Sequence, residues 1–588
     1  MRVAALAGPY VTALLVAVVL TLVCERVARR FRLIAHPRED RWHRESVPLL
    51  GGLAIMLTVA VVGAGWGARL GRFAPLLVLS FAMGVVGLVD DVRTLRPQTK
   101  LAAQIVGAAV LIQFGALLPL TQFAIVNLLL TLFWMVAITN AFNLLDNMDG
   151  LAAGVAVLTA VFRLWLFLID GDGDGAWMMA ALVGAAGGFL IRNYPPAKIF
   201  MGDAGSLFLG FFLGGVSLVS SYAQTRGVIA VLVFPILLVL VPILDTSFVT
   251  VTRLLSGRSV AQGGRDHTSH RLMALGISER KALSLLLGVS TVSGVLAILS
   301  YQQGFRYSII LLALLIIWLA LLGVHLSRAH VVTAQAGGEA AATFRFVNDF
   351  PYKRHVVTLG IDAMLIVVAY YASYLLRFEG TFEAERANFM RSVGPILGLQ
   401  ILALAVFGSY RGIWRYTSLS DLVRLCRAAT AGVAASVLYL VFTTRFETFS
   451  RAVFVLDWAL LILLLAGSRV AFRLLGDWLR PRSRTSRRAL IYGAGDGGAL
   501  TLRELLNNAG LARRPVGFLD DDRHKRGRRI YGLPILGGLD LAEEIFTAQQ
   551  VEEVIVASQK IPPERLEQLS ALCTARGVLV TRASLWIQ

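Results

Sequence analysis

Long apolar segments recur along the first four-fifths of the chain. Fifteen of them carry few charges and approach the roughly 20 residues that a helix needs to cross the hydrocarbon core of a bilayer. Eleven precede residue 327, at residues 10–23, 49–66, 75–89, 101–117, 124–138, 151–169, 177–191, 206–220, 228–244, 283–299 and 309–326. Four more follow, at residues 356–376, 393–407, 428–441 and 453–470. The pattern predicts a polytopic α-helical membrane protein with about 11 + 4 transmembrane helices, in contact with membrane lipids.

Two changes of composition divide the chain. Residues 327–354 contain alanine and glycine in place of an apolar run, so we expect a linker there. It would separate a membrane domain of residues 1–326 from a four-helix membrane domain of residues 355–475. Residues 485–588 follow a basic stretch and have the composition of a soluble α/β domain. We therefore expect a C-terminal cytoplasmic domain with a Rossmann-like fold.

Composition and charge support a membrane location. Apolar residues make up 56% of the chain, charged residues 16%, and the mean hydropathy is +0.69. The net charge of +19 does not indicate nucleic acid, because most Lys and Arg stand in short loops beside apolar segments. Residues 26–44 contain seven arginines. By the positive-inside rule this loop is cytoplasmic, which predicts a multi-pass protein of the inner (plasma) membrane.

Five loops lie on the predicted cytoplasmic side: the basic loop at residues 26–44 and four others that carry chemically active residues next to the membrane. The first of these four ends a span with Asp90 and Asp91, and Lys100 follows. Adjacent carboxylates repel each other, so the pair is reasonable if a cation or a proton to be removed compensates it. The alternative is an ordinary solvated helix end.

A second loop carries amides and acids at regular spacing. Asn140, Asn143, Asp146 and Asp149 recur at i, i+3, so a helical start would place them along one stripe that lines a polar pocket. Acids at the membrane are costly to bury and by default mark a functional site.

The last two loops contain groups that suit phosphate. Gly202 and Gly205 flank Asp203 at the start of a span, where glycine lets backbone N–H groups approach phosphate and the aspartate suits Mg²⁺. Residues 264–271 hold two arginines and two histidines, which can bind a diphosphate; zinc is the weaker alternative. Carboxylates, Mg²⁺ and basic groups on one side of a helical bundle indicate phosphoryl transfer.

At these residues the sequence resembles the polyprenyl-phosphate N-acetylhexosamine 1-phosphate transferases, over residues 1–326. The resemblance implies transfer of a sugar 1-phosphate from a UDP-N-acetylhexosamine to polyprenyl phosphate, with Mg²⁺ or Mn²⁺ as cofactor. It implies catalytic roles for Asp90, Asp91 and His267, and metal binding by Asp203 and Asp91. The substrate-binding residues that it implies are His43, Lys100, Asn143, Asp146, Asp149, Phe200, Arg265 and His270.

Two positions depart from the family pattern. Asn147 stands where the family often has glycine, and Ser269 stands where the histidine loop often has a third imidazole. The second departure bears on the contacts of the histidine loop and on the choice of donor sugar. The muramyl-peptide branch of the family is disfavoured, because its run of adjacent histidines is missing.

The C-terminal region contains a glycine-rich fingerprint. A strand at residues 488–492 leads into Gly493, Gly495 and Gly498 and then a helical stretch, and a second strand ends at Asp520. This G-x-G-x-x-G context predicts nucleotide binding, with Asp520 at the ribose. The region from residue 346 resembles the membrane and first Rossmann-like portion of nucleotide-sugar epimerases and dehydratases. No Tyr-x-x-x-Lys follows Gly493, so redox chemistry is not predicted, and a docking module is the alternative.

Other functions are compatible with part of the pattern. A transporter or flippase would also have many helices and membrane acids, but its acids would stand in mid-span, whereas these cluster at span ends. A scaffold for nucleotide-sugar enzymes is a third reading that is compatible with the first. The sequence leaves a homodimer open.

Overall fold

We describe the protein from a computed structural model. It describes residues 4–35, 46–65, 70–220, 228–255, 266–303, 305–326, 353–410, 419–478, 487–507, 511, 513–558 and 561–583. The chain divides into two compact units, Met1–Leu479 and Arg480–Gln588, and each is treated by itself. The predicted linker at residues 327–354 falls almost wholly outside the described residues.

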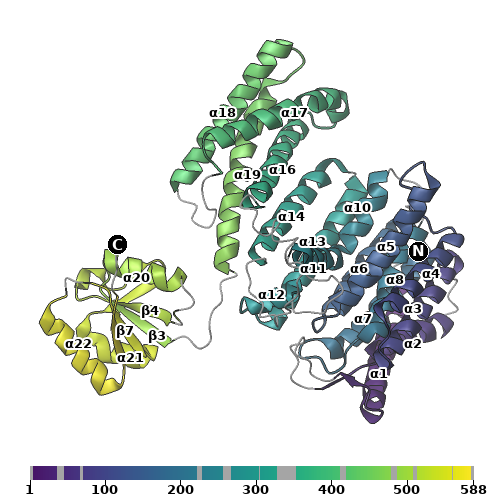
Figure 1. Ribbon diagram of the computed structural model, residues 1–588, viewed down its shortest axis with the longest axis horizontal. Helices are drawn as coiled ribbons and strands as arrows, with labels where there is room; N and C mark the ends of the chain where they lie inside the picture. The colour runs from purple at the N-terminus through teal and green to yellow at the C-terminus, as the bar shows by residue number, and fades with distance from the viewer. Residues whose placement is uncertain are drawn as a thin grey trace, which may run out of the picture. The chain divides into compact units, whose positions relative to one another are not determined.

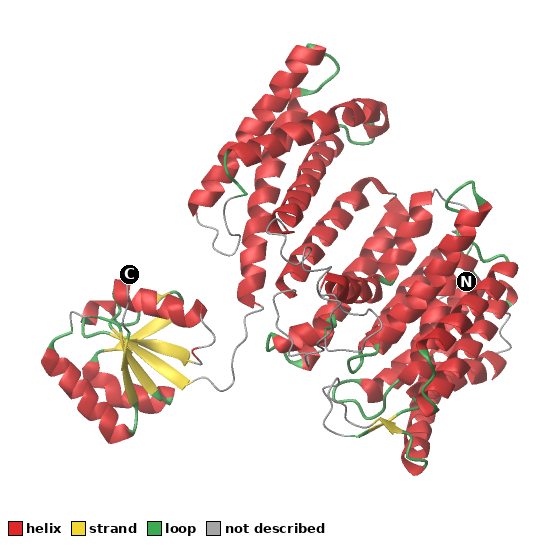
Figure 2. Ribbon diagram, in the orientation of Figure 1, coloured by secondary structure: helices red, strands yellow, loops and turns green. Residues whose placement is uncertain are grey.

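The first unit is helical (Figures 1 and 2). Its first part contains two-residue strands β1 (Ile34–Ala35) and β2 (Val47–Pro48) and the short 3-10 helix η1 (Gly71–Phe73). The helices of this part are α1 (Ala4–Arg30), α2 (Gly51–Gly65), α3 (Ala74–Val92), α4 (Pro97–Gln113), α5 (Ala124–Leu145), α6 (Leu151–Ile169), α7 (Gly173–Asn193), α8 (Gly202–Val219), α10 (Val228–Leu238), α11 (Leu240–Leu255), α12 (Thr268–Ala274), α13 (Glu279–Gln303) and α14 (Phe305–Leu326). Its second part contains α16 (Lys353–Arg377), α17 (Phe382–Val406), α18 (Leu419–Thr444) and α19 (Arg451–Trp478).

The chain is a multi-pass membrane protein. Among the described residues, 12 helices are long and apolar enough to cross a bilayer. Three of the predicted spans are less regular than expected. The span at 49–66 is the 15-residue helix α2, and the span at 101–117 lies mostly in the 17-residue helix α4. The span at 228–244 is divided between α10, which ends at Leu238, and α11, which begins at Leu240, with a turn at Val239.

Helix α8 forms the centre of the first part. Of its 18 residues, 83% are buried, and the helix packs against α3, α5 and α2. Glycine makes these close contacts possible. A Cβ at Gly52 would lie 2.0 Å from the Gly205 backbone N, and a Cβ at Gly87 would lie 2.2 Å from the Asp203 carbonyl O. The start of α8 is therefore held by backbone contact with α2 and α3.

Helices α16, α17 and α19 bury polar groups among apolar side chains. Arg469 forms a bidentate ion pair with Asp362, with both N···O distances 2.8 Å and both side chains almost fully buried. Gln400 Nε2 donates to Asp457 Oδ2 at 2.8 Å, also in the interior. Charges buried in this way must be paired, so these contacts fix how α16, α17 and α19 pack.

The second unit is an α/β domain. Its sheet has six strands in the order β5-β6-β4-β3-β7-β8, and all neighbours are parallel except the β5–β6 pair. The strands are β3 (Arg487–Tyr492), β4 (Arg513–Leu519), β5 (Arg529–Ile530), β6 (Leu533–Gly537), β7 (Glu553–Val556) and β8 (Leu579–Arg582). The helices are α20 (Asp496–Asn507), α21 (Ala542–Gln549) and α22 (Pro563–Arg576), with the one-turn 3-10 helices η4 (Arg523–Lys525) and η5 (Leu539–Leu541). The order β6-β4-β3-β7-β8 is that of a Rossmann-like fold, which confirms the predicted fold class.

Candidate functional site

Two aspartates and a lysine from three helices meet at one end of the first part. Asp90 lies in the last turn of α3, Lys100 in the first turn of α4, and Asp203 in the first turn of α8. Lys100 Nζ donates to Asp90 Oδ2 and to Asp203 Oδ2, each at 2.8 Å. Asp203 and Lys100 keep 28% and 23% of their side chains exposed, so solvent reaches the cluster.

Asp91 makes different contacts from its neighbour Asp90. Its Oδ1 accepts from Asp203 N at 2.9 Å and its Oδ2 from Ala204 N at 3.0 Å. These N–H groups stand in the first turn of α8 and lack intrahelical partners, so Asp91 caps that helix from α3. Gly202, at φ +72°, makes the turn that presents them. In this arrangement Asp91 fixes the position of Asp203.

The loop before α8 is aligned by backbone contacts with the region after β1. Phe200 N donates to Pro48 O at 2.9 Å, and Gly51 N donates to Phe200 O at 3.0 Å. Gly52 N donates to Met201 O at 2.8 Å. Phe200 therefore lies against residues 48–51. The predicted substrate-binding residue His43 lies outside the described residues.

The end of α5 connects this cluster to the rest of the site. Asn140 Nδ2 donates to Gln104 Oε1 of α4 at 2.7 Å, and Asn143 Nδ2 donates to Ser206 Oγ of α8 at 2.9 Å. The sequence did not indicate Gln104 or Ser206 as partners. Their contacts place the amides of α5 against α4 and α8, two of the three helices that carry cluster residues.

The expected single stripe of amides and acids is wrong in its second half. Helix α5 ends at Leu145, so only Asn140 and Asn143 share a helical face. The helix stops because Asn147 Nδ2 binds the Leu144 carbonyl at 2.7 Å and Gly150 takes a positive φ of +73°. Asp146 follows the helix end and lies in the turn that leads to Asn147.

Asp149 is buried and holds the loop that leads to Phe200. Its Oδ2 accepts from Ala197 N at 2.7 Å. Asn193 supports the same loop, because its side chain binds Gly150 N at 3.0 Å and Ile199 O at 2.9 Å. Asp149 therefore supports the backbone of the loop that leads to Phe200.

The histidine loop is anchored by Asp245, an acid in the second turn of α11. His267 Nδ1 lies 2.8 Å from Asp245 Oδ2, and Thr268 N donates to Asp245 Oδ1 at 2.7 Å. The ring of His270 lies 5.9 Å from that of His267 and is buried. Arg265 lies outside the described residues. The signal for Asp245 in the sequence was its position at the end of the preceding span.

The two departures from the family pattern contact each other. Ser269 Oγ donates to Asn147 Oδ1 at 2.6 Å, and Asn147 Nδ2 lies 3.4 Å from Asp245 Oδ2. The hydroxyl and the amide thus join the histidine loop to the end of α5. Because Asn147 follows the end of α5, and Asn143 near that end binds Ser206 of α8, this contact brings the histidine loop to the same end of the bundle as the aspartates.

The start of the histidine loop is fixed by a buried ion pair. Arg253 Nε and NH2 donate to the two carboxylate oxygens of Asp266, both at 2.7 Å. Burial of Asp266 acts to raise the pKa of its carboxyl, but the hydrogen bonds and charge of Arg253 outweigh burial and hold this pKa below its usual value. Asp266 therefore stays ionised and clamps the loop to α11.

The donor set suits a hard cation better than zinc. Within the described part of the chain, no group of three or more His, Cys, Asp and Glu side chains is placed to hold a metal ion. Asp90 and Asp203, however, each bring an oxygen within 2.8 Å of one Lys100 nitrogen. Mg²⁺ is bound by one or two carboxylates together with substrate phosphates and waters, so this pair fits it without a larger cage.

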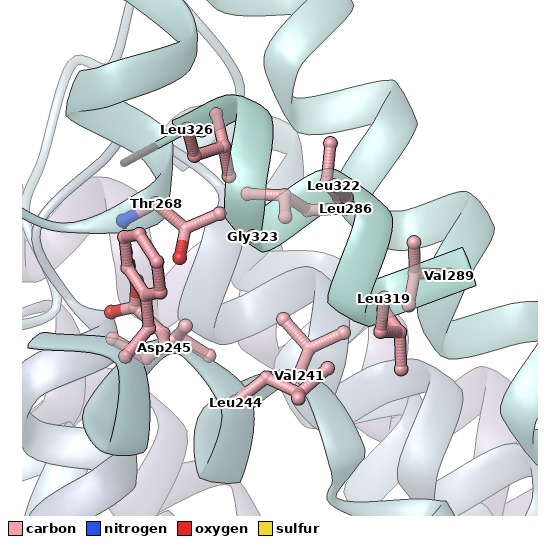
Figure 3. A pocket seen from close by; sticks show the side chains of 12 residues that line it. Val241, Leu244, Asp245, Thr268, Leu286, Val289, Leu319, Leu322, Gly323 and Leu326 are labelled. Atoms are coloured by element: carbon pink, nitrogen blue, oxygen red, sulfur yellow. Dashed lines mark hydrogen bonds between the residues drawn. The ribbon is translucent and has the colours of Figure 1, made fainter. Parts of the chain in front are cut away.

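An apolar pocket adjoins the anchored histidine loop (Figure 3). Asp245 and Thr268 supply polar groups on one side of the view, and leucine and valine side chains of α11, α13 and α14 form the other side. Its other lining residues are Leu145, Val241, Leu244, Phe248, Leu286, Val289, Leu319, Leu322, Gly323 and Leu326. The pocket therefore has polar groups at one end and an apolar lining elsewhere.

The glycine loop of the C-terminal unit follows β3, whose two neighbours in the sheet are β4 and β7. A Cβ at Gly498 would lie 1.9 Å from the Gly493 carbonyl O, so this glycine is needed for packing. Gly493 has a φ of +106°. A Cβ at Gly495 would meet no atom within 4 Å. Only the middle glycine of the fingerprint therefore faces open space.

Asp520 is engaged by the chain itself. Its Oδ2 accepts from Ala494 N at 2.8 Å and from Lys525 Nζ at 3.0 Å, and its Oδ1 accepts from Asp522 N at 3.0 Å. Partial burial acts to raise the pKa of the Asp520 carboxyl, but these donors outweigh burial and hold the pKa below its usual value. A ribose at this position would have to share the carboxylate with the glycine loop.

Comparison with known proteins identifies two regions. The profile of glycosyl transferase family 4 matches residues 73–221, and that of the CoA-binding domain matches residues 405–580. The chain is 30% identical over 326 residues to a probable undecaprenyl-phosphate N-acetylglucosaminyl 1-phosphate transferase of Bacillus subtilis, which covers 53% of this chain and 90% of that protein.

Two further relatives match different shares of the chain. A decaprenyl-phosphate N-acetylglucosaminephosphotransferase of Mycolicibacterium smegmatis is 36% identical over 299 residues, covering 44% of this chain and 73% of the relative. The probable polysaccharide biosynthesis protein EpsC of Bacillus subtilis is 30% identical over 225 residues, covering 38% of this chain and 37% of the relative. The chain therefore belongs to glycosyl transferase family 4, which confirms the resemblance to the polyprenyl-phosphate N-acetylhexosamine 1-phosphate transferases.

Proposed function

We propose that this protein transfers an N-acetylhexosamine 1-phosphate from a UDP-sugar to polyprenyl phosphate, giving a polyprenyl-diphosphate sugar and UMP. The observation that carries the proposal is the meeting of Asp90, Asp203 and Lys100 at one end of the bundle. The named relatives use undecaprenyl or decaprenyl phosphate and N-acetylglucosamine, so UDP-N-acetylglucosamine is the first donor to test. The product would initiate synthesis of a cell-surface glycan.

The reaction exchanges one phosphorus–oxygen bond for another. An oxygen of the lipid phosphate attacks the phosphorus that bears the sugar, and the bond from that phosphorus to UMP breaks, so UMP leaves with the electron pair. Asp90 orients the acceptor phosphate or takes its proton, because Asp91 is engaged at the start of α8. Lys100 and the histidine loop neutralise phosphate charge, and Phe200 stacks near uracil.

Mg²⁺ is the cofactor that we assign to Asp203 and Asp90, with Mn²⁺ as a substitute. When bound, the ion neutralises diphosphate charge. Asp91, which the sequence also predicted as a metal ligand, supports the site through the backbone of α8 in this proposal. Asn143 and Asp146 shape the nucleotide site, and Asp149 acts on it by holding the loop before Phe200.

In this proposal the site and the C-terminal domain lie on the cytoplasmic side of the plasma membrane. The supporting feature is the excess of arginine in the first loop, together with the polar contacts that gather the active loops at one end of the helices. A UDP-sugar is water-soluble, so the site must open to the compartment that contains it. The apolar pocket beside Asp245 offers a surface that suits the prenyl chain of the acceptor.

The direct test uses purified full-length protein with Mg²⁺, polyprenyl phosphate and a panel of UDP-sugars, and measures UMP release. We expect release with a UDP-N-acetylhexosamine, and loss of release when EDTA removes the metal. Release from no donor would contradict the proposal and favour a transporter, a flippase or a scaffold for nucleotide-sugar enzymes. Undiminished release in EDTA would contradict the metal assignment alone.

We also propose that the C-terminal domain binds a nucleotide-containing ligand through its glycine loop. The supporting observation is the open space at Gly495 beside the first turn of α20, where a diphosphate can approach backbone N–H groups. Equilibrium dialysis of the full-length protein against UDP-sugar, NAD and coenzyme A would identify the ligand. Gly495→Val should weaken binding at least tenfold, and equal binding by the variant would favour a docking role.

A further inference from the structure

Helix α14 is buried on two sides that belong to different hydrophobic cores. Leu322 and Leu326 pack in the core that contains α3, α5 and α8. Ile317 and Leu321 pack in the core that contains α16, α17 and α19. A helix shared in this way transmits its position from one helical group to the other, because close-packed cores deform little.

The last turn of α14 supports the histidine loop. Arg271 lies in α12, next to His270, and its NH1 donates to the Leu326 carbonyl at 3.2 Å. Arg271 Nε also donates to Asp266 O at 3.0 Å. Arg271 thereby ties both the start of the histidine loop and α12 to the end of α14.

The same turn is held from the other side by α19. His325 Nε2 lies 2.9 Å from the Phe472 carbonyl O, and since a carbonyl only accepts, Nε2 carries the proton. The two rings stack with centroids 4.2 Å apart. A Cβ at Gly476 would lie 3.0 Å from His325 Cε1, so glycine lets the imidazole reach α19. His325 therefore fastens the α14 end to the second helical part.

We propose that His325 is a positioning residue of the transferase site. By holding the end of α14 against α19, it keeps the Leu326 carbonyl where Arg271 can bind it, and Arg271 in turn orients the loop of His267 and His270. The second helical part is then a structural component of the site. This inference rests on the proposed function for its kinetic consequence, but the contact chain itself can be tested without turnover.

The kinetic test compares His325→Ala with His325→Gln in the full-length protein. A glutamine keeps an N–H near the position of Nε2, so it should retain kcat/KM within about threefold. The alanine variant should raise KM for the UDP-sugar about tenfold and leave KM for polyprenyl phosphate unchanged, because the histidine loop acts on the diphosphate. Wild-type kinetics in a folded His325→Ala protein would overturn the proposal, as would an equal loss in both variants.

A glycine pair tests the same contact from α19. Gly476→Val should push the imidazole away and raise KM for the UDP-sugar, because even the Cβ would lie 3.0 Å from His325 Cε1, whereas Gly467→Val, whose Cβ would meet no atom within 4 Å, should not. This pair decides the matter if His325→Ala fails to fold. Equal kinetics of the two glycine variants would overturn the proposal.

Hydrogen exchange separates this inference from the proposed function. Amides of α12 should exchange at least fivefold faster in His325→Ala than in wild type, with no substrate present. If wild type releases no UMP from any donor, the proposed function fails and the exchange result alone decides whether His325 positions the loop. Unchanged exchange in α12 would overturn the positioning role.

Discussion

Asp90 and Asp91 show how one residue of helical rotation separates two roles. Successive side chains on an α-helix point about 100° apart. Asp90 consequently faces Lys100, while Asp91 faces the N–H groups at the start of α8. The adjacent acids are compensated by different partners, a side-chain ammonium and two backbone donors. Their shared sequence motif therefore combines an acid that pairs with Lys100 and one that fixes the start of α8.

Asp203→Asn should abolish turnover. The amide keeps the size of the side chain but removes the charge that pairs with Lys100 and that we assign to the metal. UMP release should fall by at least about 100-fold, in the range for lost electrostatic stabilisation. Asp174→Asn is a matched control, because Asp174 is exposed in the first turn of α7 and lies outside the site. Near wild-type turnover in Asp203→Asn would refute its role.

Asp520 gives the C-terminal unit a defined dependence on pH. Its pKa is lower in the folded protein than its usual value near 3.9, so its contribution to stability is present above pH 4 and is lost as the pH falls through the lowered pKa. Asp520→Asn should lower the stability of this unit at pH 7 by roughly 1–2 kcal/mol, the scale of a charge-assisted hydrogen bond.

The measurement is the hydrogen exchange of β3 and α20 amides in the full-length protein, corrected for the intrinsic effect of pH. The difference between variant and wild type should shrink as the pH falls from about 4 through the lowered pKa, because the carboxyl is then protonated first in the unfolded state and finally in the folded protein. A difference that stays constant to pH 3 would show that Asp520 acts through packing.

At the scale of elements, glycine contacts align the acidic cluster. The Cβ atoms that Gly52 and Gly87 lack would occupy backbone positions of α8. Backbone contact of this kind leaves little room for α8 to slide or rotate. The position of Asp203 relative to α3 is thus fixed by small residues that carry no chemistry of their own.

Gly87→Ala should disrupt the site without changing any polar group. The added Cβ would lie 2.2 Å from Asp203 O, so α8 must move away from α3. We expect a loss of about 1–3 kcal/mol in stability from overpacking and about 100-fold in turnover from misplacement of Asp203. Gly63→Ala in α2 is the control, because its Cβ would meet no atom within 4 Å. Equal turnover of the two variants would contradict this role of Gly87.

The sequence predicts elements better than it predicts how they meet. Hydrophobic runs identify where helices cross the membrane, but α17 begins at Phe382, earlier than the predicted 393, because helical hydrogen bonds continue into polar residues. The break at Val239 and the short helix α12 carry no periodic signal. Strands β3 and β4 were predicted, whereas the two-residue strand β5 is too short for a pattern.

The site shows the same limit. Residue types and spacing indicated Asp90, Lys100 and Asp203, because acids and bases at membrane ends are rare enough to be informative. Asp91 caps α8, and Asp149 supports the loop before Phe200. Both contacts join residues more than 40 positions apart in the sequence, and local spacing does not reveal such contacts. The roles assigned to the site residues stay predictions.

At the scale of the whole molecule, the active loops gather at one end of the first helical part. Contacts join α4 to α5, α5 to α8, and α5 to the histidine loop. The opposite ends carry a separate ion pair between Arg72 and Asp172. Orientation in the membrane therefore decides which compartment supplies the nucleotide sugar.

Single-cysteine labelling should reveal this orientation. In a variant with Cys24, Cys426 and Cys573 replaced by alanine, Gln122→Cys should react with an impermeant maleimide in intact spheroplasts, since residue 122 is exposed in the loop between α4 and α5. Gln98→Cys, equally exposed in the first turn of α4, should react only after permeabilisation. The reverse pattern would place the site outside the cell.

The bridge formed by Lys100 has a thermodynamic consequence for the affinity of the site for metal and nucleotide sugar. Lys100 is the cation that pairs with both carboxylates in the resting cluster. The ammonium is in effect a built-in counter-ion, and a divalent cation held by the two acids would expel it by repulsion. The expelled lysine would then need a new anion, which the diphosphate would supply. Metal and nucleotide sugar should thus each tighten the binding of the other by the same factor.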